Sequence, residues 1–546
     1  MSDMSPPRLL HLAQKSLLGH EALAILSLDQ LPREIFPSLF VEAFNRRLLS
    51  ILKAMKSLLG HEALAILSLD QLPRVMFPSL FVEAFNRRLL SILKAMVRVW
   101  PFDFLPLGAL MLWPQVDILK AVLDGLDMNY TQKSDCRRGK LHVLDLRDAP
   151  LNFWNMWAES LDDACSSEPK MRGQPVEHKG PMSALKVIAN VYLTTATPDE
   201  FLTHLLQWVK ERASLVHLCC HKLKISENLI SSMSKILDSL EFGCIQEVQV
   251  NSDWQFSTLA KFAPYLGRMG SLRKLSLSHI WFLTPITPED KVQLNSDFCS
   301  KLANLPHLRS LHMNSVDFLK DNVDLVLRYL KKPLETLSVA TCQLSEADVR
   351  YLSQCPSLRE LKHLHLRGVK LTHISPEPLQ VLLERVAANL LTLNFMGCEI
   401  TDSHLNAILP ALSQCYQLTK LHFWGNRISM AMMEKLMEHT GKLSALRVEL
   451  YPAPLESYDT EGDDQQERFF HLCTQLLDML KRTREPKNAV FSTNPCRKFI
   501  YPLVFGRRLH TWYECHLLVH SVDMSTSFQI FATQICNEYV SDWLRL

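Results

Sequence analysis

Apolar residues recur in the C-terminal half of the chain in the pattern LxxLxLxxNxL. The second apolar position of this pattern falls at Val248, Leu275, Leu311, Leu337, Leu364, Leu393, Leu421 and Leu446. Successive positions are 25 to 29 residues apart, apart from one interval of 36. A period of about 20–29 residues is typical of an array of short structural repeats rather than of one compact core.

The spacing within each copy has a physical cause. The xLxL segment predicts a short strand, because alternation sends its two leucines to the same side. The residue at the asparagine position, such as Cys342, Cys398 or Asn426, is expected to point inward and bond to backbone groups at the turn. Helices return the chain to the next strand. Ser345 and Asp348 resemble a capping box, and Pro376 begins a second helix. The sequence therefore predicts an α/β leucine-rich-repeat solenoid, a curved horseshoe with parallel strands on its concave face.

A second, nearly perfect repeat lies at the N-terminus. Residues 15–55 recur at 56–96, and only Glu34 and Ile35 change, to Val75 and Met76. Apolar residues within the unit follow helical spacing, and two prolines interrupt it. The unit predicts a helical cap at the N-terminal end of the solenoid.

Composition and motifs limit the chemistry. With 546 residues, 47% apolar residues and a net charge of +2, the chain shows no global basis for binding nucleic acid or a membrane. Its 14 cysteines contain no CxxC pair, and no secretory signal is recognised, so we expect reduced, buried thiols. Cys219 and Cys220 lie beside two histidines, but burial is the commoner state of such cysteines. Enzyme signatures such as a P-loop, HExxH or GxSxG do not occur. The sequence thus favours a binding protein, with no catalytic residue, metal or cofactor.

Several segments together resemble the PRAME (preferentially expressed antigen in melanoma) family. They include LPREIFPSLFVEAF at 31–44, VWPFDFLPLGALM at 99–111 and LHVLDLRDAPLNFWNMWA at 141–158. The resemblance extends over about residues 1–498, apart from one surplus copy of the N-terminal unit. It implies a horseshoe of leucine-rich repeats with a helical N-terminal cap. It also implies a substrate receptor of a cullin-2-type ubiquitin ligase, and some family members act in transcriptional repression.

With this resemblance, four regions are expected. Residues 1–100 form the helical cap with its tandem duplication, and 101–240 are a family-specific first part of the repeat domain. Residues 241–495 carry the leucine-rich repeats. The tail, 496–546, departs from the family pattern, and we assign it no function.

A ligase receptor must bind an elongin B/C and cullin module. The elongin box resembles an amphipathic helix with an aliphatic, a small and an aliphatic residue four positions apart, on one face. Residues at this spacing are Leu18, Ala22 and Leu26, and in the second copy Leu59, Ala63 and Leu67. A cullin box resembles an aliphatic-proline pair followed by apolar residues, here Leu31, Pro32, Ile35 and Leu39, with Leu72, Pro73, Met76 and Leu80 as the second set. The alternative is a helix that only shields the end of the repeat core. We favour docking by the first copy, which keeps Glu34.

Substrate is expected to bind the concave strand face. Candidate residues, all at outward positions of the strands, are His312, His363, His365, Asn394, Lys420 and His422. We interpret these histidines as solvated surface and predict no metal site among them.

The predicted function is therefore a substrate-recognition subunit that promotes ubiquitination and proteasomal degradation of a bound protein. Its expected partners are elongin B/C, cullin-2 with a RING subunit, and an unknown protein substrate, in the cytoplasm or the nucleus. The alternative is a nuclear corepressor that negatively regulates transcription, and thereby differentiation and apoptosis. Two LxxLL stretches could serve it, Leu202-Leu205-Leu206 and Leu379-Leu382-Leu383, although burial of such leucines in a core is commoner.

Overall fold

The chain is seen here in a computed structural model that divides into two compact units. The structure describes residues 16–20, 74, 76–111, 113–131, 140–149, 153–154, 156–157, 184–194, 199–226, 234, 236–282, 297–459, 465–493 and 504–506. Unit 1 takes in Met1–Val191, Thr197–His221 and Ser239–Glu241. Unit 2 takes in Tyr192–Ala196, Lys222–Asp238 and Phe242–Leu546.

Unit 1 combines helices with the first strands of the chain. Its elements are α5 (Met76–Asn86), α6 (Leu90–Arg98), β1 (Phe104–Leu105), η5 (Leu107–Leu110), α7 (Val116–Thr131), β2 (Val143–Asp145), α9 (Glu200–Glu211) and most of β3 (Leu185–Leu193) and β4 (Val216–Ile225). The strands β1, β2 and β3 pair in parallel. Aromatic side chains fill the core beside α5, where Phe81 stacks on Trp154 and packs edge-on against Trp100. The Trp100 Nε1 donates to the Phe104 carbonyl at 3.0 Å, so its one polar atom is satisfied.

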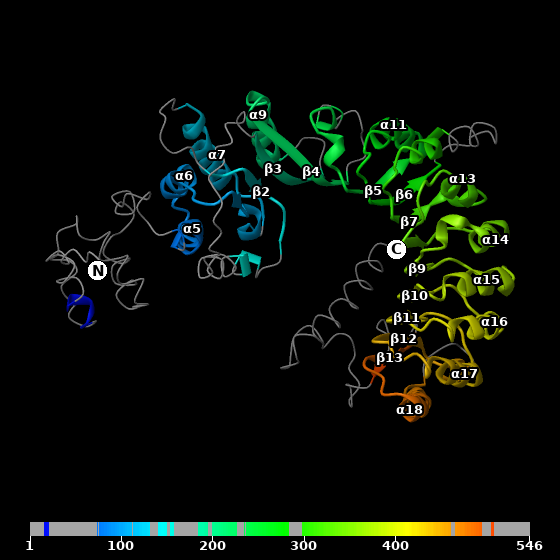
Figure 1. The fold of residues 1–546 in the computed structure, drawn as a ribbon. Coiled ribbons are helices and arrows are strands. Elements are labelled where there is room, and N and C mark those ends of the chain that lie inside the picture. The colour runs from blue at the N-terminus through cyan, green and yellow to red at the C-terminus, as the bar shows by residue number, and fades with distance from the viewer. Residues whose placement is uncertain are drawn as a thin grey trace, which may run out of the picture. The chain divides into compact units, whose positions relative to one another are not determined.

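Unit 2 is a regular alternation of strands with helices. In chain order its elements are η6 (Phe242–Cys244), β5 (Glu247–Gln255), α11 (Phe256–Leu266), β6 (Lys274–Trp281), β7 (Ser310–Val316), η7 (Asp317–Leu319), α13 (Val323–Arg328), β8 (Thr336–Ala340), α14 (Glu346–Gln354), η8 (Pro356–Leu358), β9 (His363–His365), α15 (Pro376–Val386), β10 (Thr392–Asn394), α16 (Asp402–Leu412), β11 (Lys420–His422), α17 (Met430–Thr440), β12 (Val448–Pro452), η9 (Leu455–Ser457), α18 (Gln466–Thr483), β13 (Ala489–Ser492) and β14 (Val504–Gly506). Neighbouring strands follow one another in sequence order and pair in parallel, except that β14 is antiparallel to β13. The strands line the inner side of an arc and the helices α11 to α18 its outer side (Figure 1).

The leucine positions of successive repeats are aligned across this sheet. Leu311, Leu337, Leu364, Leu393 and Leu421 are partners in the register of β7 to β11. Each of these side chains is at most 1% exposed. The repeat prediction is confirmed, because one continuous apolar ladder forms the core between strands and helices.

The turn after each strand has a constant geometry. The residue before the inward position has a positive φ, for example 47° at Thr341, 63° at Gly397 and 79° at Gly425. The next residue, Asn426 in the last of these turns, donates from Nδ2 to the Phe395 carbonyl at 2.8 Å. Its Oδ1 accepts from the Ile400 backbone N–H at 2.9 Å. The inward-pointing role predicted for this position is confirmed, since the side chain satisfies backbone groups that a turn leaves unpaired.

The helices begin where the sequence indicates. Ser345 and Asp348 form a reciprocal capping box at the start of α14, as predicted. The α15 helix begins at Pro376, where its fixed φ and missing N–H are tolerated. No helix of the described residues is both long and apolar enough to cross a membrane.

The last rung of the ladder differs from the sequence prediction. The pattern placed Leu446 there, whereas the register pairs Leu421 with Glu449 on β12. The Glu449 side chain is fully buried and forms a two-pronged ion pair with the Arg484 guanidinium. The hydroxyl of Tyr451 also donates to Glu449, at 2.7 Å. A buried carboxylate is stable here because three donors of charged or polar groups replace its water.

Candidate binding face

The outward side of the repeat strands carries two rows of polar side chains. Alternation places the residue after each core leucine on the face opposite the helices. In register across β6 to β11, the first row consists of Ser276, His312, Ser338, His365, Asn394 and His422. The structure therefore brings four of the predicted substrate-binding residues into one line across neighbouring strands.

The second row lies two residues earlier on the same strands. In register it runs through Glu247, Lys274, Ser310, Thr336, His363, Thr392 and Lys420. His363 Nδ1 lies 3.0 Å from the Thr392 hydroxyl, and Lys420 is exposed. All six predicted concave-face residues thus share one continuous surface of unit 2, which we call the strand face.

The histidines of the strand face are only partly solvated, whereas the sequence interpretation expected solvated surface. His312, His365 and His422 are half-buried. Burial, together with neighbouring cationic or titratable groups, lowers the pKa of each to about 4, and Glu247 opposes this shift at His312. Neighbouring strands lie about 4.8 Å apart, so the side chains of one row stand close together and are partly shielded from water. At neutral pH the row is uncharged.

One nitrogen of the row has no partner. The Nε2 atom of His422 is buried, and no protein group among the described residues hydrogen-bonds to it. A buried polar atom without a bond is uncommon and destabilises the state that contains it. Nε2 of His422 is therefore a polar atom that the packing of the row leaves unsatisfied.

Two carboxylates on or beside the strand face are already neutralised. Glu335 is held between Arg309 and Lys362, and the Lys362 Nζ lies 3.0 Å from it. The hydrogen bond from Arg309 keeps the pKa of Glu335 below its usual value. Glu247 lies 2.9 Å from the Lys274 ammonium. The sequence analysis missed both acids, although each occupies an outward position or the residue before it.

The predicted docking boxes fall mostly outside the described residues. Leu18 is described and buried, in unit 1. Eleven further residues of the elongin and cullin boxes lie outside the described residues: Ala22, Leu26, Leu31, Pro32, Ile35, Leu39, Leu59, Ala63, Leu67, Leu72 and Pro73. Of the second cullin set, Met76 begins α5 and Leu80 is half-buried on it. The boxes remain predictions.

The LxxLL leucines lie mainly in the cores. Leu379, Leu382 and Leu383 of α15 are buried. Leu202 and Leu205 of α9 are buried as well, and Leu206 is half-buried. Docking either motif in a receptor groove would require the helix to unpack first.

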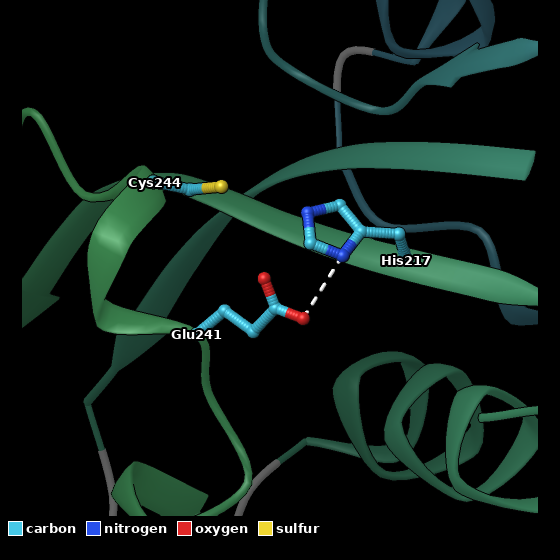
Figure 2. Close-up of side chains that lie close together, drawn as sticks. All are labelled: His217, Glu241 and Cys244. Carbon is cyan, nitrogen blue, oxygen red and sulfur yellow. Dashed lines mark ion pairs between the residues drawn. The ribbon is translucent and has the colours of Figure 1, made fainter. Parts of the chain in front are cut away.

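The strand β4 carries the two adjacent cysteines and an ion pair. Cys219 and Cys220 are buried, as the sequence analysis expected. His217 Nδ1 lies 2.9 Å from a Glu241 carboxylate oxygen in unit 1, and Figure 2 shows the two side chains facing each other. Cys244, also drawn there, belongs to unit 2. Glu241 is exposed and His217 is half-buried, so the pair is partly screened by solvent.

Parallel strands joined by outer helices, with an inward leucine ladder, define a leucine-rich-repeat solenoid, a class of scaffold with an extended binding face. The PRAME C-terminal domain matches residues 185–507. The PRAME N-terminal domain matches twice, at residues 6–57 and 54–154, in line with the duplicated unit. The chain belongs to the PRAME family.

Curated human relatives agree with this assignment. The chain is 48% identical over 498 residues to PRAME family member 12 of Homo sapiens, covering 91% of this chain and 94% of the relative. It is 47% identical over 499 residues to PRAME family member 8 of Homo sapiens, covering 91% and 96%. Among solved structures, the yeast complex of Rad7 and Elc1 matches 52% of this chain and 74% of that chain at 15% identity. The TM-score of this match is 0.32.

Proposed function

We propose that this chain is a substrate-recognition subunit of a cullin-2-type RING ubiquitin ligase. The observation that carries the proposal is family membership across both halves, because the PRAME N-terminal and C-terminal domains are both present. The family resemblance implies this role. The strand face supports it, since unit 2 offers six aligned strands of polar side chains for a protein partner.

In this role the chain works by holding two proteins together. The strand face binds the substrate, and the N-terminal boxes bind elongin B/C and cullin-2 with its RING subunit. The substrate then lies near a ubiquitin-conjugating enzyme, so that a bimolecular transfer becomes effectively intramolecular. The chain supplies no catalytic residue, and the product is a ubiquitinated protein for proteasomal degradation. We propose that it acts in the cytoplasm or nucleus, where this machinery operates.

Co-purification with elongin B/C tests the proposal. The full chain is co-expressed with elongin B and elongin C, and recovery is compared with that of Leu18→Asp, Leu59→Asp and the double variant. We expect the double variant to lose elongin, because a carboxylate on the apolar face of the docking helix would be desolvated without a partner. Differences between the single variants identify the copy that docks.

The control separates docking from folding. Val381→Asp places the same charge on α15, at a side chain that is 40% exposed, far along the sequence from the boxes. It should retain elongin. Because Leu18 is buried, circular dichroism of every variant checks that the fold is kept. Failure of the intact chain to recover elongin B/C would remove the proposal.

A further inference from the structure

The connections that lead from each helix to the next strand differ in charge along unit 2. Because the strands β5 to β13 run parallel, all these connections lie at one edge of the sheet. The two connections before β10 and β11, residues 387–391 and 413–419, hold no charged residue. The four connections before β6, β7, β8 and β9 hold seven lysines and arginines but only two carboxylates; they are residues 267–273, 303–309, 329–335 and 355–362.

Backbone hydrogen bonds hold the residues that precede these strands in one line. The carbonyl of Arg273 accepts the Arg309 N–H at 2.9 Å. The carbonyl of Arg309 accepts the Glu335 N–H at 2.8 Å, and that of Glu335 accepts the Lys362 N–H, also at 2.8 Å. The four residues therefore occupy successive places along the edge, each about 4.8 Å from the next.

The carboxylates of this stretch do not balance its cations. Glu335 is shared by two of them, since it pairs with Arg309 and lies 3.0 Å from the Lys362 ammonium. The second carboxylate, Glu360, pairs with Arg359 at 3.5 Å. Three further cations are exposed and have no ion-pair partner among the described residues: Arg273, Lys331 and Lys332. We call Arg273, Arg309, Lys331, Lys332 and Lys362 the cationic edge.

Overall composition does not account for the cationic edge. The chain has 59 lysines and arginines against 57 aspartates and glutamates, and its solubility would be served equally by charges spread over all connections. Like charges on neighbouring strands repel each other. A negatively charged partner relieves this repulsion, and the hydrogen-bonded row is already ordered before the partner binds.

The length of the row indicates the kind of partner. Arg273 and Lys362 are three strand spacings apart, about 14 Å, which is about the length of four to five residues of extended chain. Proteins that bind DNA commonly contact roughly six to ten phosphates, more than this edge can neutralise. A short acidic segment of a protein fits the row better.

We propose that the cationic edge binds a run of about five aspartate or glutamate residues in an extended segment of a partner protein. A run is needed because only alternate side chains of an extended segment face the edge. The inference rests on the proposed function for the identity of the partner as a ubiquitination substrate. The contact itself does not involve the elongin boxes.

Fluorescence anisotropy of a labelled peptide with the full chain tests the contact. The probe carries consecutive glutamates between glycine and serine residues, and the matched peptide carries glutamine instead. We expect only the glutamate peptide to bind, and to bind roughly tenfold more weakly when salt rises from about 20 to about 200 mM, because exposed charges are screened. Between pH 6 and 8 its affinity should stay constant, since none of these side chains normally titrates there.

Variants assign the contact to the cationic edge. Arg273→Gln should weaken binding roughly two- to fivefold, the effect of one exposed charge pair. The triple variant with Lys331→Gln and Lys332→Gln should bind the glutamate peptide no better than the glutamine peptide. Arg427→Gln is the matched control, because Arg427 is exposed in the turn from β11 to α17, at the opposite edge. It should bind like the parent, and circular dichroism checks the fold of each variant.

Five outcomes would overturn the inference. They are no binding of the glutamate peptide at low salt, equal binding of the glutamine peptide, full binding by the triple variant, equal weakening by Arg427→Gln, and tighter binding of a single-stranded oligothymidylate. Because the assay contains no elongin, its failure is distinguishable from failure of the ligase proposal. A chain that recovers elongin but ignores the peptide keeps the proposed function and loses only this contact.

Discussion

Adjacent residues of each repeat strand point to opposite faces of the sheet, and the two faces differ in composition. Leu364 and Leu393 point to the helices and are fully buried in the core, whereas His365 and Asn394 point to the strand face. The inward side is nearly uniform across five repeats, because any change of size opens a void in a packed ladder. The outward side varies from strand to strand. The difference teaches that core packing and the chemistry of the strand face can vary independently here, residue by residue.

The largest effect is expected at Glu449, a charged residue that occupies a core position of the ladder. Replacing it by Ala should destabilise unit 2 by about 3–5 kcal/mol, since Arg484 would be left buried without its carboxylate. Chemical denaturation measures the loss. The double variant Glu449→Leu with Arg484→Met should recover most of it, because the unpaired charge is gone. A small effect of Glu449→Ala alone would mean that the ion pair is solvated.

A neighbouring pair of substitutions compares the two faces directly. Leu393→Ala should cost roughly 2–5 kcal/mol, because it leaves a cavity in the ladder. Asn394→Ala, one residue later on the strand face, should cost only about 0.5–1.5 kcal/mol, through loss of the 3.0 Å hydrogen bond from the Met396 N–H to its Oδ1. Urea unfolding of both variants provides the measurement. Equal losses would contradict the assignment of core and surface.

Three histidines of the strand face, His312, His365 and His422, make the free energy of unfolding depend on pH. The pKa of His312, His365 and His422 is about 4 in the folded chain, below the usual 6.5. Between these values the unfolded chain binds more protons, so stability is complete above pH 6.5 and falls as pH drops towards 4. The loss is up to about 3 kcal/mol for each histidine.

The triple variant with Asn at all three positions isolates this contribution. Its unfolding free energy should decline less than that of the parent between pH 7.5 and 4.5. Parallel pH curves for the two proteins would mean that the row is solvated after all. Carboxylates elsewhere titrate in both proteins and cancel in the difference.

The turn between the two faces gives a small effect. Gly397 has a φ of 63°, and a Cβ there would meet no atom closer than 4.0 Å. Gly397→Ala should therefore cost about 1 kcal/mol through backbone strain alone. Asn tolerates the left-handed region better, so Gly397→Asn should lose less. Thermal unfolding compares them, and a larger loss for Asn would contradict this explanation.

The fold was predictable from sequence because its main contacts recur at a fixed interval. The spacing of Leu337, Leu364, Leu393 and Leu421 is enough to place them in one ladder. The end of the ladder was not predictable. Glu449 needs Arg484, which lies 35 residues later and has no place in the repeat pattern.

The residues of the candidate site were predictable from the sequence, but their burial and their ion pairs were not. Period-two alternation identifies His365 and His422 as outward residues. Their burial depends on which side chains of neighbouring strands stand beside them, and that is a property of the register. The ion pairs of Glu335 are also made between strands, so no single repeat reveals them.

Nuclear magnetic resonance of the chain with ¹³C-labelled histidine tests the central claim, that His312, His365 and His422 on the strand face are partly buried and have a lowered pKa. Chemical shifts of the ring carbons are followed from pH 8 to 4, and His→Asn variants assign the signals. We expect His365 and His422 to titrate with a pKa of about 4. Titration of both near 6.5, the value of a solvated ring, would contradict the account.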